Sequence, residues 1–246
     1  MNSPKKLTDA DDRRFMKSAL ALARRGLGTV APNPSVGCVI VTPEGRIIGR
    51  GWTQPGGRPH AETEALARAG QAAHGATAYV TLEPCSHTGQ TPPCCEALID
   101  AGIARVVVAI EDPDERVSGS GIAMLEDAGI AVSLGVMSEE ASALNLGFLL
   151  HRQEGRPLVT LKSATTLDGR IAAHNGESRW ITGPEARRRA HLMRMRHDAI
   201  VVGIGTALLD DPELTCRLPG LEGHSPVRIV IDSRLQLPLV SKLVRT

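Results

Sequence analysis

A short segment that occurs twice constrains the fold of this chain more than any other feature. Leu98–Ala104 (LIDAGIA) returns almost unchanged as Leu125–Ala131 (LEDAGIA). Each copy has the pattern of a helix end, a glycine turn and the start of a β-branched strand. Consecutive helix–strand units of this kind pair their strands in parallel through right-handed crossovers. We therefore expect the first 150 residues to form a mixed sheet flanked by helices.

The remaining elements of this first part follow from periodicity and turn residues. A 3.6-residue period after Thr8, a candidate N-cap, predicts a helix that ends near Gly26. Apolar runs on both sides of Thr42-Pro43-Glu44-Gly45 predict a β-hairpin. The expected hairpin strands are Val36–Val41 and Arg46–Gly51, followed by a helix from about His60 to Gly70 and a strand over Ala76–Leu82.

A polar segment containing glycine and proline, His151–Pro157, separates two parts of the chain. We expect one domain over residues 1–150 and a second over residues 151–246. In the second we expect a strand over Leu158–Leu161, a helix over Pro184–Arg196, a buried strand over Ala199–Val202 and a strand over Val227–Ile231. Ninety-six residues are few for an α/β unit that binds a dinucleotide, so this domain is expected to be incomplete.

Charge is distributed unequally between the two parts. The formal net charge is only +1, which argues against nucleic acid or a membrane surface as a partner. Residues 1–150 carry 13 Lys/Arg against 17 Asp/Glu, whereas residues 151–246 carry 15 against 10. A basic second part suits a phosphate-bearing ligand, although a solvated arginine face has the same composition.

The cysteines indicate metal chemistry. Five cysteines and no apparent export signal or membrane span favour a cytoplasmic protein that binds a metal over a disulfide framework. His60 and Glu62, followed by Cys85 and Cys94, supply one imidazole, two thiolates and a carboxylate. Three such ligands suit Zn²⁺ and leave a fourth position for water, whose proton Glu62 is placed to accept.

Other readings of these cysteines stay open at the level of sequence. Cys95 could replace Cys94 as the ligand, because only one of two adjacent helical residues can face the metal. A structural zinc would use His87 or Cys95 as a fourth ligand, but it would not need Glu62. Cys38 and Cys216 are expected to be small buried apolar residues.

The segment Pro84–Cys95 (PCSHTGQTPPCC) resembles the bacterial bifunctional riboflavin-biosynthesis enzymes, as do Pro32–Val39 and His60-Ala61-Glu62. The similarity continues in LDGR at Leu167–Arg170, in SRWITG at Ser178–Gly183 and in DDPELTCR at Asp210–Arg217. This resemblance implies a three-layer α/β deaminase domain of the cytidine-deaminase type and an incomplete dihydrofolate-reductase-like domain.

The resemblance also implies a reaction and its residues. A zinc ion held by His60, Cys85 and Cys94, with Glu62 as the catalytic group, would deaminate 2,5-diamino-6-(5-phosphoribosylamino)pyrimidin-4-one. NADPH would then reduce the ribose of the product to a ribityl chain. Substrate contacts are implied for Asn33, His87, Ser178, Arg194, Leu214 and Arg217, and cofactor contacts for Ala164, Trp180, Thr206, Asp210 and Ser233.

Three departures from the family pattern qualify this expectation. Gln90 stands where relatives carry Lys or Arg, Thr53 stands where they carry His, and the chain ends at Thr246, within the reductase half. We therefore expect deamination with weak or no reduction. The alternatives are a deaminase of tRNA adenosine, which the scarcity of basic patches and aromatic residues disfavours, and a binding module with a structural zinc. Self-association is expected because relatives commonly form oligomers.

Overall fold

The computed structural model describes residues 7–88, 92–113, 118–178 and 180–246, and it divides the chain into two compact units. Unit 1 extends to Val159 and unit 2 covers Thr160–Thr246. The boundary expected at residue 150 falls inside helix α6 (Leu146–Glu154), so much of the polar segment taken for a linker is helical.

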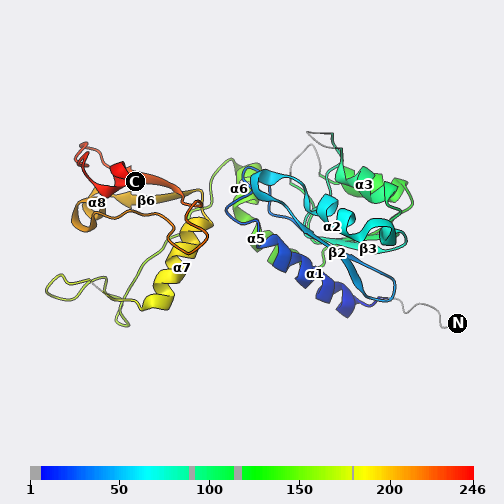
Figure 1. Ribbon diagram of the computed structural model, residues 1–246, viewed down its shortest axis with the longest axis horizontal. Helices are drawn as coiled ribbons and strands as arrows, with labels where there is room; N and C mark the ends of the chain where they lie inside the picture. The colour runs from blue at the N-terminus through cyan, green and yellow to red at the C-terminus, as the bar shows by residue number, and fades with distance from the viewer. Residues whose placement is uncertain (1–6, 89–91, 114–117, 179) are drawn as a thin grey trace. The chain divides into compact units, whose positions relative to one another are not determined.

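Unit 1 is built on a five-stranded mixed sheet in the order β2-β1-β3-β4-β5 (Figure 1). Strands β3, β4 and β5 run parallel, as the repeated segments predict, whereas β1 is antiparallel to both β2 and β3. The strands are β1 (Gly37–Val41), β2 (Ile47–Trp52), β3 (Thr77–Val80), β4 (Arg105–Val108) and β5 (Ala131–Leu134). The predicted hairpin is therefore confirmed, with its turn at residues 42–46.

Helices cover both faces of this sheet because alternate strand residues point to opposite sides. Cys38 and Ile40 of β1 pack in a core with α2 and α3, whereas Val39 and Val41 pack in a second core with α1. The helices are α1 (Asp9–Ala23), α2 (Ala61–Ala69), α3 (Cys94–Asp100), α4 (Ser120–Asp127), α5 (Ser138–Leu144) and α6, with 3-10 turns at Pro55–Gly57 and Gly70–Ala73. The result is the expected three-layer α/β architecture (Figure 1).

Helix α1 begins as the sequence predicts. Thr8 caps it in a capping box with Asp11, whose backbone N–H donates to the Thr8 hydroxyl at 3.3 Å. The helix ends at Ala23, before the expected stop at Gly26, and Gly26 lies in the turn that follows. Met16 and Leu20 of this helix are buried against the sheet.

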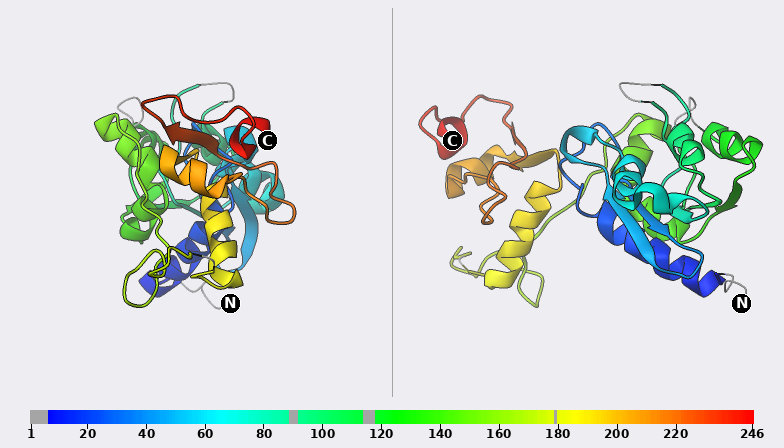
Figure 2. Two further views of the ribbon diagram at one scale, coloured as in Figure 1. Left: turned by 90° about the vertical axis from the view of Figure 1, so that its left-hand side faces the viewer. Right: turned by 45° about the vertical axis from the view of Figure 1, so that its right-hand side comes forward.

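Unit 2 has far less regular structure than unit 1 (Figure 2). It pairs β6 (Ala199–Gly203) with β7 (Val227–Ile231) in parallel and adds α7 (Pro184–Met195), α8 (Ile204–Asp210) and α9 (Lys242–Arg245). The helix predicted over Pro184–Arg196 is confirmed as α7, and the predicted strand at Val227–Ile231 is confirmed as β7. A small core forms where Ala207, Leu214 and Leu243 meet one face of the two strands.

Two predictions for the part of the chain after residue 150 are wrong. Leu158–Leu161 forms no strand, and Leu161 is 91% exposed, because its apolar residues find no neighbouring strand in the described chain. The strand at Ala199–Val202 exists but is not buried, since alternate residues of β6 and β7 are exposed on one face. In the part of the chain that the structure describes, no helix is long and apolar enough to span a membrane.

Candidate metal centre and active site

Helix α2 brings two of the predicted functional residues to one end of the sheet. His60 is the N-cap of α2 and Glu62 lies in its first turn. The helix rests directly on β2, because a Cβ atom on Gly51 would lie 2.0 Å from the Ala61 carbonyl oxygen. This close approach fixes the position of the start of α2 relative to β2.

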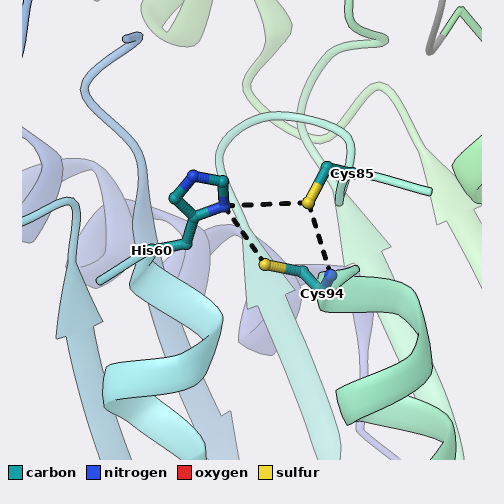
Figure 3. Close-up of side chains that lie close together, drawn as sticks. All are labelled: His60, Cys85 and Cys94. Atoms are coloured by element: carbon teal, nitrogen blue, oxygen red, sulfur yellow. Dashed lines mark hydrogen bonds between the residues drawn. The ribbon is translucent and has the colours of Figure 1, made fainter. Parts of the chain in front are cut away.

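The two cysteines come from the segment that connects β3 to α3. Cys85 lies after β3, and Cys94 is the first residue of α3. The backbone N–H of Cys94 donates to Cys85 Sγ at 3.3 Å, and the N–H of Cys95 donates to the Cys85 carbonyl oxygen at 3.2 Å. The two ends of this segment therefore meet, and the two sulfurs lie side by side (Figure 3).

His60, Cys85 and Cys94 form a donor set with the spacing of a metal site (Figure 3). The Nδ1 atom of His60 lies 3.3 Å from Cys94 Sγ and 3.7 Å from Cys85 Sγ. Zinc bonds of about 2.0 Å to nitrogen and 2.3 Å to sulfur, arranged tetrahedrally, would separate these donors by about 3.5 Å. The residues present therefore fit a zinc ion with three protein ligands.

The pKa shifts in this cluster fit a site that exchanges protons for a metal. Hydrogen bonds from Cys94 and His60 lower the pKa of Cys85 to about 4, against the opposing effect of burial. The pKa of Cys94 is raised, because its thiol is hydrogen-bonded to Cys85 and is buried. Thiolate is the form that binds metal, so metal binding at this pair of cysteines would displace thiol protons.

Glu62 is the acidic group beside this donor set. Its side chain is almost fully buried, at 4% exposure, and burial raises the pKa of its carboxyl to about 7. A carboxyl group with a pKa near neutrality can both accept and return a proton.

The structure resolves the choice between the adjacent cysteines. The Cys95 thiol is buried and donates to the carbonyl oxygens of Pro84 and Gly121, at 3.3 and 3.4 Å, so it points away from the cluster. His87 lines the neighbouring pocket without joining the group of candidate ligands found among the described residues. Cys38 and Cys216 are buried, as expected.

A pocket of about 110 Å³ opens beside Glu62 and the donor set. Asn33 and His87, the two deaminase contacts expected from the sequence, both line it. Asn33 is held there by a 3.0 Å hydrogen bond from its Nδ2 to the Gly57 carbonyl oxygen. Thr53 also lines the pocket, but its hydroxyl accepts from the Val36 N–H at 2.9 Å. Gln90 lies outside the described residues.

Several lining residues were missed by sequence reasoning. Arg58, Glu83, Asp112, Phe148 and Arg152 all face the pocket. Arg58 could have been noticed two residues before His60. Arg152 was assigned to a linker, because the sequence pattern did not show that α6 continues to Glu154 or that it lies beside the pocket.

The residues expected to bind ligands in unit 2 are only partly brought together. Arg194 and Arg217 both contact His191: Arg194 Nη1 lies 3.3 Å from His191 Nδ1, which accepts from the backbone N–H of Arg217 at 3.2 Å, whereas the Arg217 guanidinium donates to Glu213 at 2.7 Å. Leu214, three residues before Arg217, is buried. Trp180 is 72% exposed, and the guanidinium of Arg187 lies over its ring. The other expected residues are Thr206 and Asp210 on α8, Ser233 after β7, and Ala164 and Ser178 in segments without regular structure.

Two family models match this chain, one in each of its two parts. The family model for the cytidine and deoxycytidylate deaminase zinc-binding region matches residues 9–110, and the model for the RibD C-terminal domain matches residues 157–246. Fold and donor set thus place unit 1 in the class of zinc-binding deaminase domains.

Individual relatives define the family more narrowly. The chain is 50% identical over 245 residues to riboflavin biosynthesis protein RibD of Escherichia coli, covering 95% of this chain and 66% of that protein. The corresponding protein of Aquifex aeolicus is 49% identical over 235 residues, with coverage of 96% and 65%. The chain thus spans about two thirds of the length of these curated relatives.

Solved structures give the same result. Acinetobacter baumannii RibD superposes with a TM-score of 0.88 at 45% identity, over 97% of this chain and 68% of that one. A Thermotoga maritima diaminohydroxyphosphoribosylaminopyrimidine deaminase/5-amino-6-(5-phosphoribosylamino)uracil reductase superposes with a TM-score of 0.89 at 44% identity, over 96% and 67%. The chain belongs to the RibD family of riboflavin biosynthesis proteins.

Proposed function

We propose that unit 1 catalyses the hydrolytic deamination of 2,5-diamino-6-(5-phosphoribosylamino)pyrimidin-4-one in riboflavin biosynthesis. The observation that carries this proposal is the buried carboxyl group of Glu62 beside the His60–Cys85–Cys94 donor set, at the wall of a pocket. A structural zinc site needs no such acid–base group. The family membership supports the choice of a pyrimidine as substrate.

The residues of the chain divide the work. His60, Cys85 and Cys94 would hold the zinc ion, which when bound lowers the pKa of a coordinated water toward neutrality. Glu62 takes one proton from the attacking water and delivers it to the ring nitrogen, and it then moves the second proton, from the new hydroxyl group on the ring carbon, to the leaving amino group, so that ammonia is released and a carbonyl forms. Burial of Glu62 supports both transfers, because a pKa near 7 lets it accept and donate at neutral pH.

A phosphorylated substrate suits the pocket. Arg58 and Arg152 both line it, and guanidinium groups match the geometry of phosphate oxygens. These two arginines supply cationic groups independently of residue 90. Such a substrate does not cross a membrane unaided, so we place the reaction in the cytoplasm.

We further infer that unit 2 provides residues of an NADPH-dependent reductase that acts on the deaminated product. Its match to the RibD C-terminal domain supports this assignment, and two arginines beside His191 suit a substrate phosphate: Arg194, and Arg217, whose guanidinium is ion-paired with Glu213 at 2.7 Å. Exposed apolar side chains of unit 2 also support self-association of the chain.

Glu62→Gln tests the deaminase directly. We expect release of ammonia from the phosphoribosyl pyrimidine to fall by about 10²–10⁴-fold, since this is the usual contribution of a general acid–base group. The zinc content should remain one ion per chain. Equal activity of the variant and the native chain would favour a structural zinc, and preferential turnover of tRNA adenosine by the native chain would favour an RNA deaminase.

A further inference from the structure

Glu83 is a buried carboxylate that the proposed chemistry does not use. It lies between β3 and the metal-binding residue Cys85, and its side chain is only 4% exposed. It also lines the pocket beside Glu62. A charged side chain is rarely buried in this way unless several partners hydrogen-bond to it.

Among the residues that the structure describes, four backbone N–H groups donate to the Glu83 carboxylate. Oε1 accepts from Gly121 at 2.9 Å and from Ile122 at 3.2 Å. Oε2 accepts from Asp112 and from Gly119, each at 3.1 Å. These donors lie on both sides of a chain segment that leads from β4 to the start of α4, so one side chain holds both ends of that segment.

Close packing confirms how tightly this junction is built. A Cβ atom on Gly121 would lie 2.2 Å from the Pro84 carbonyl oxygen, so only glycine fits there. The thiol of Cys95 donates to the carbonyl oxygens of both Pro84 and Gly121. The start of α4, the start of α3 and the segment that contains Cys85 therefore meet at a single point.

We propose that Glu83 is a positioning residue of the deaminase site. The main chain of Glu83 leads through Pro84 directly to Cys85. The Glu83 carboxylate accepts a hydrogen bond from the backbone N–H of Asp112, and Asp112 forms part of the pocket wall. One side chain thereby sets the place of a zinc ligand relative to the wall that the substrate would face. The inference rests on the proposed function for its catalytic meaning, but its structural content concerns the metal site alone.

Glu83→Gln is the sharpest test, because it keeps the shape of the side chain. The amide nitrogen would replace one carboxylate oxygen and direct N–H groups at two N–H donors. Glu111→Gln is a matched control, since Glu111 is an exposed residue of the same connecting segment and lies outside the pocket. Both variants remove one negative charge from this region of the chain.

Two measurements separate positioning from general stabilisation. We expect Glu83→Gln to lower zinc affinity, measured by chelator competition, about 10–100-fold, the usual effect of losing support around metal ligands. Visible absorption of the Co²⁺-loaded variant should shift, because thiolate–cobalt bands report the geometry at Cys85 and Cys94. Glu111→Gln should match the native chain in both. Unchanged affinity and an unchanged cobalt spectrum in Glu83→Gln would refute the proposal.

A measurement on the native chain keeps the test decisive if Glu83→Gln fails to fold. Zinc should increase the protection of the Gly119, Gly121 and Ile122 amides from hydrogen exchange, because Glu83 couples them to the Cys85 segment. Equal protection with and without zinc would overturn the coupling. None of these readouts depends on which amine is hydrolysed, so a failure of the proposed substrate and a failure of Glu83 positioning remain distinguishable.

Discussion

The side chains of the adjacent residues Cys94 and Cys95 point toward different neighbours. Cys94 Sγ lies 3.3 Å from His60 Nδ1, whereas the Cys95 thiol donates to two carbonyl oxygens on the other side of α3. Successive residues of a helix point about 100° apart, so the two sulfurs cannot share one metal. The two thiols therefore differ in their partners, although both are buried.

Alanine substitutions should therefore separate the two cysteines. We expect Cys94→Ala to lose bound zinc, because only two ligands remain. Cys95→Ala should still bind one zinc ion and should lose about 1–2 kcal/mol of unfolding free energy through a small cavity. Zinc content by atomic absorption and chemical denaturation measure the two effects. Loss of zinc from Cys95→Ala with retention by Cys94→Ala would reverse the assignment.

The buried carboxyl of Glu62 predicts a pH dependence for the metal-free chain. Its pKa is raised from 4.5 to about 7 in the folded state, so the folded state holds the proton more tightly than the unfolded state. The protonated Glu62 carboxyl therefore contributes fully to the free energy of unfolding below about pH 4.5, and this contribution is lost as the pH rises through 7.

Glu62→Gln should accordingly stabilise the metal-free chain more at pH 8 than at pH 5. A difference on the order of a few kcal/mol is expected from a shift of this size. Urea denaturation of both proteins at the two pH values, after removal of zinc, measures it. Equal stability differences at pH 5 and pH 8 would show that burial of Glu62 does not perturb its titration.

At the level of elements, the site depends on how closely α2 approaches the sheet. Gly51 on β2 lies against the backbone of α2, where any side chain would overlap the Ala61 carbonyl. His60 and Glu62 begin this helix, so a shift of α2 would displace both.

Gly51→Ala should therefore reduce both stability and zinc affinity. We expect a loss of about 1–3 kcal/mol, the usual cost of overpacking. Gly147→Ala is the control, because a Cβ atom there meets only Leu158 at 3.6 Å, an ordinary contact, and alanine favours the helix. Thermal unfolding and chelator competition measure both variants. A destabilised Gly147→Ala beside an unaffected Gly51→Ala would contradict this account.

At the level of the whole molecule, the two units differ in how completely they bury their apolar residues. Unit 1 has extended cores on both faces of its sheet. In unit 2, Val227 and Ile231 of β7 are 67% and 66% exposed, although parallel strands are normally covered on both faces. We expect weak or no NADPH oxidation by this chain with the deaminated substrate, because unit 2 leaves so much of its sheet uncovered.

Zinc should stabilise unit 1 without stabilising unit 2. A ligand at a thousand times its dissociation constant adds about 4 kcal/mol to the state that binds it. The chain contains two tryptophans, Trp52 in unit 1 and Trp180 in unit 2, so Trp180→Phe and Trp52→Phe each leave one fluorescent reporter. We expect zinc to raise the unfolding temperature only when Trp52 reports. A zinc-dependent shift reported equally by Trp180 would show that the two units unfold together.

The sequence by itself determined the parts that depend on local pattern. The repeated helix–strand segments and the hairpin turn predicted the mixed sheet, periodic apolar residues predicted its first helix, and Thr8 was the expected N-cap of α1. The residue types at positions 60, 62, 85 and 94 predicted a zinc site with an acid–base group, because an imidazole and two thiolates are ligands that suit Zn²⁺.

Only the tertiary structure decided what depends on long-range contact. It directed Cys94 toward His60 and Cys95 away, brought Arg152 of α6 to the pocket, and placed Glu83 where two distant loops converge. It also showed that Leu158–Leu161, an apolar run typical of a strand, forms none. A strand needs a partner for its backbone hydrogen bonds and a metal needs ligands from separate segments, and neither requirement is met by residues that are neighbours in the sequence.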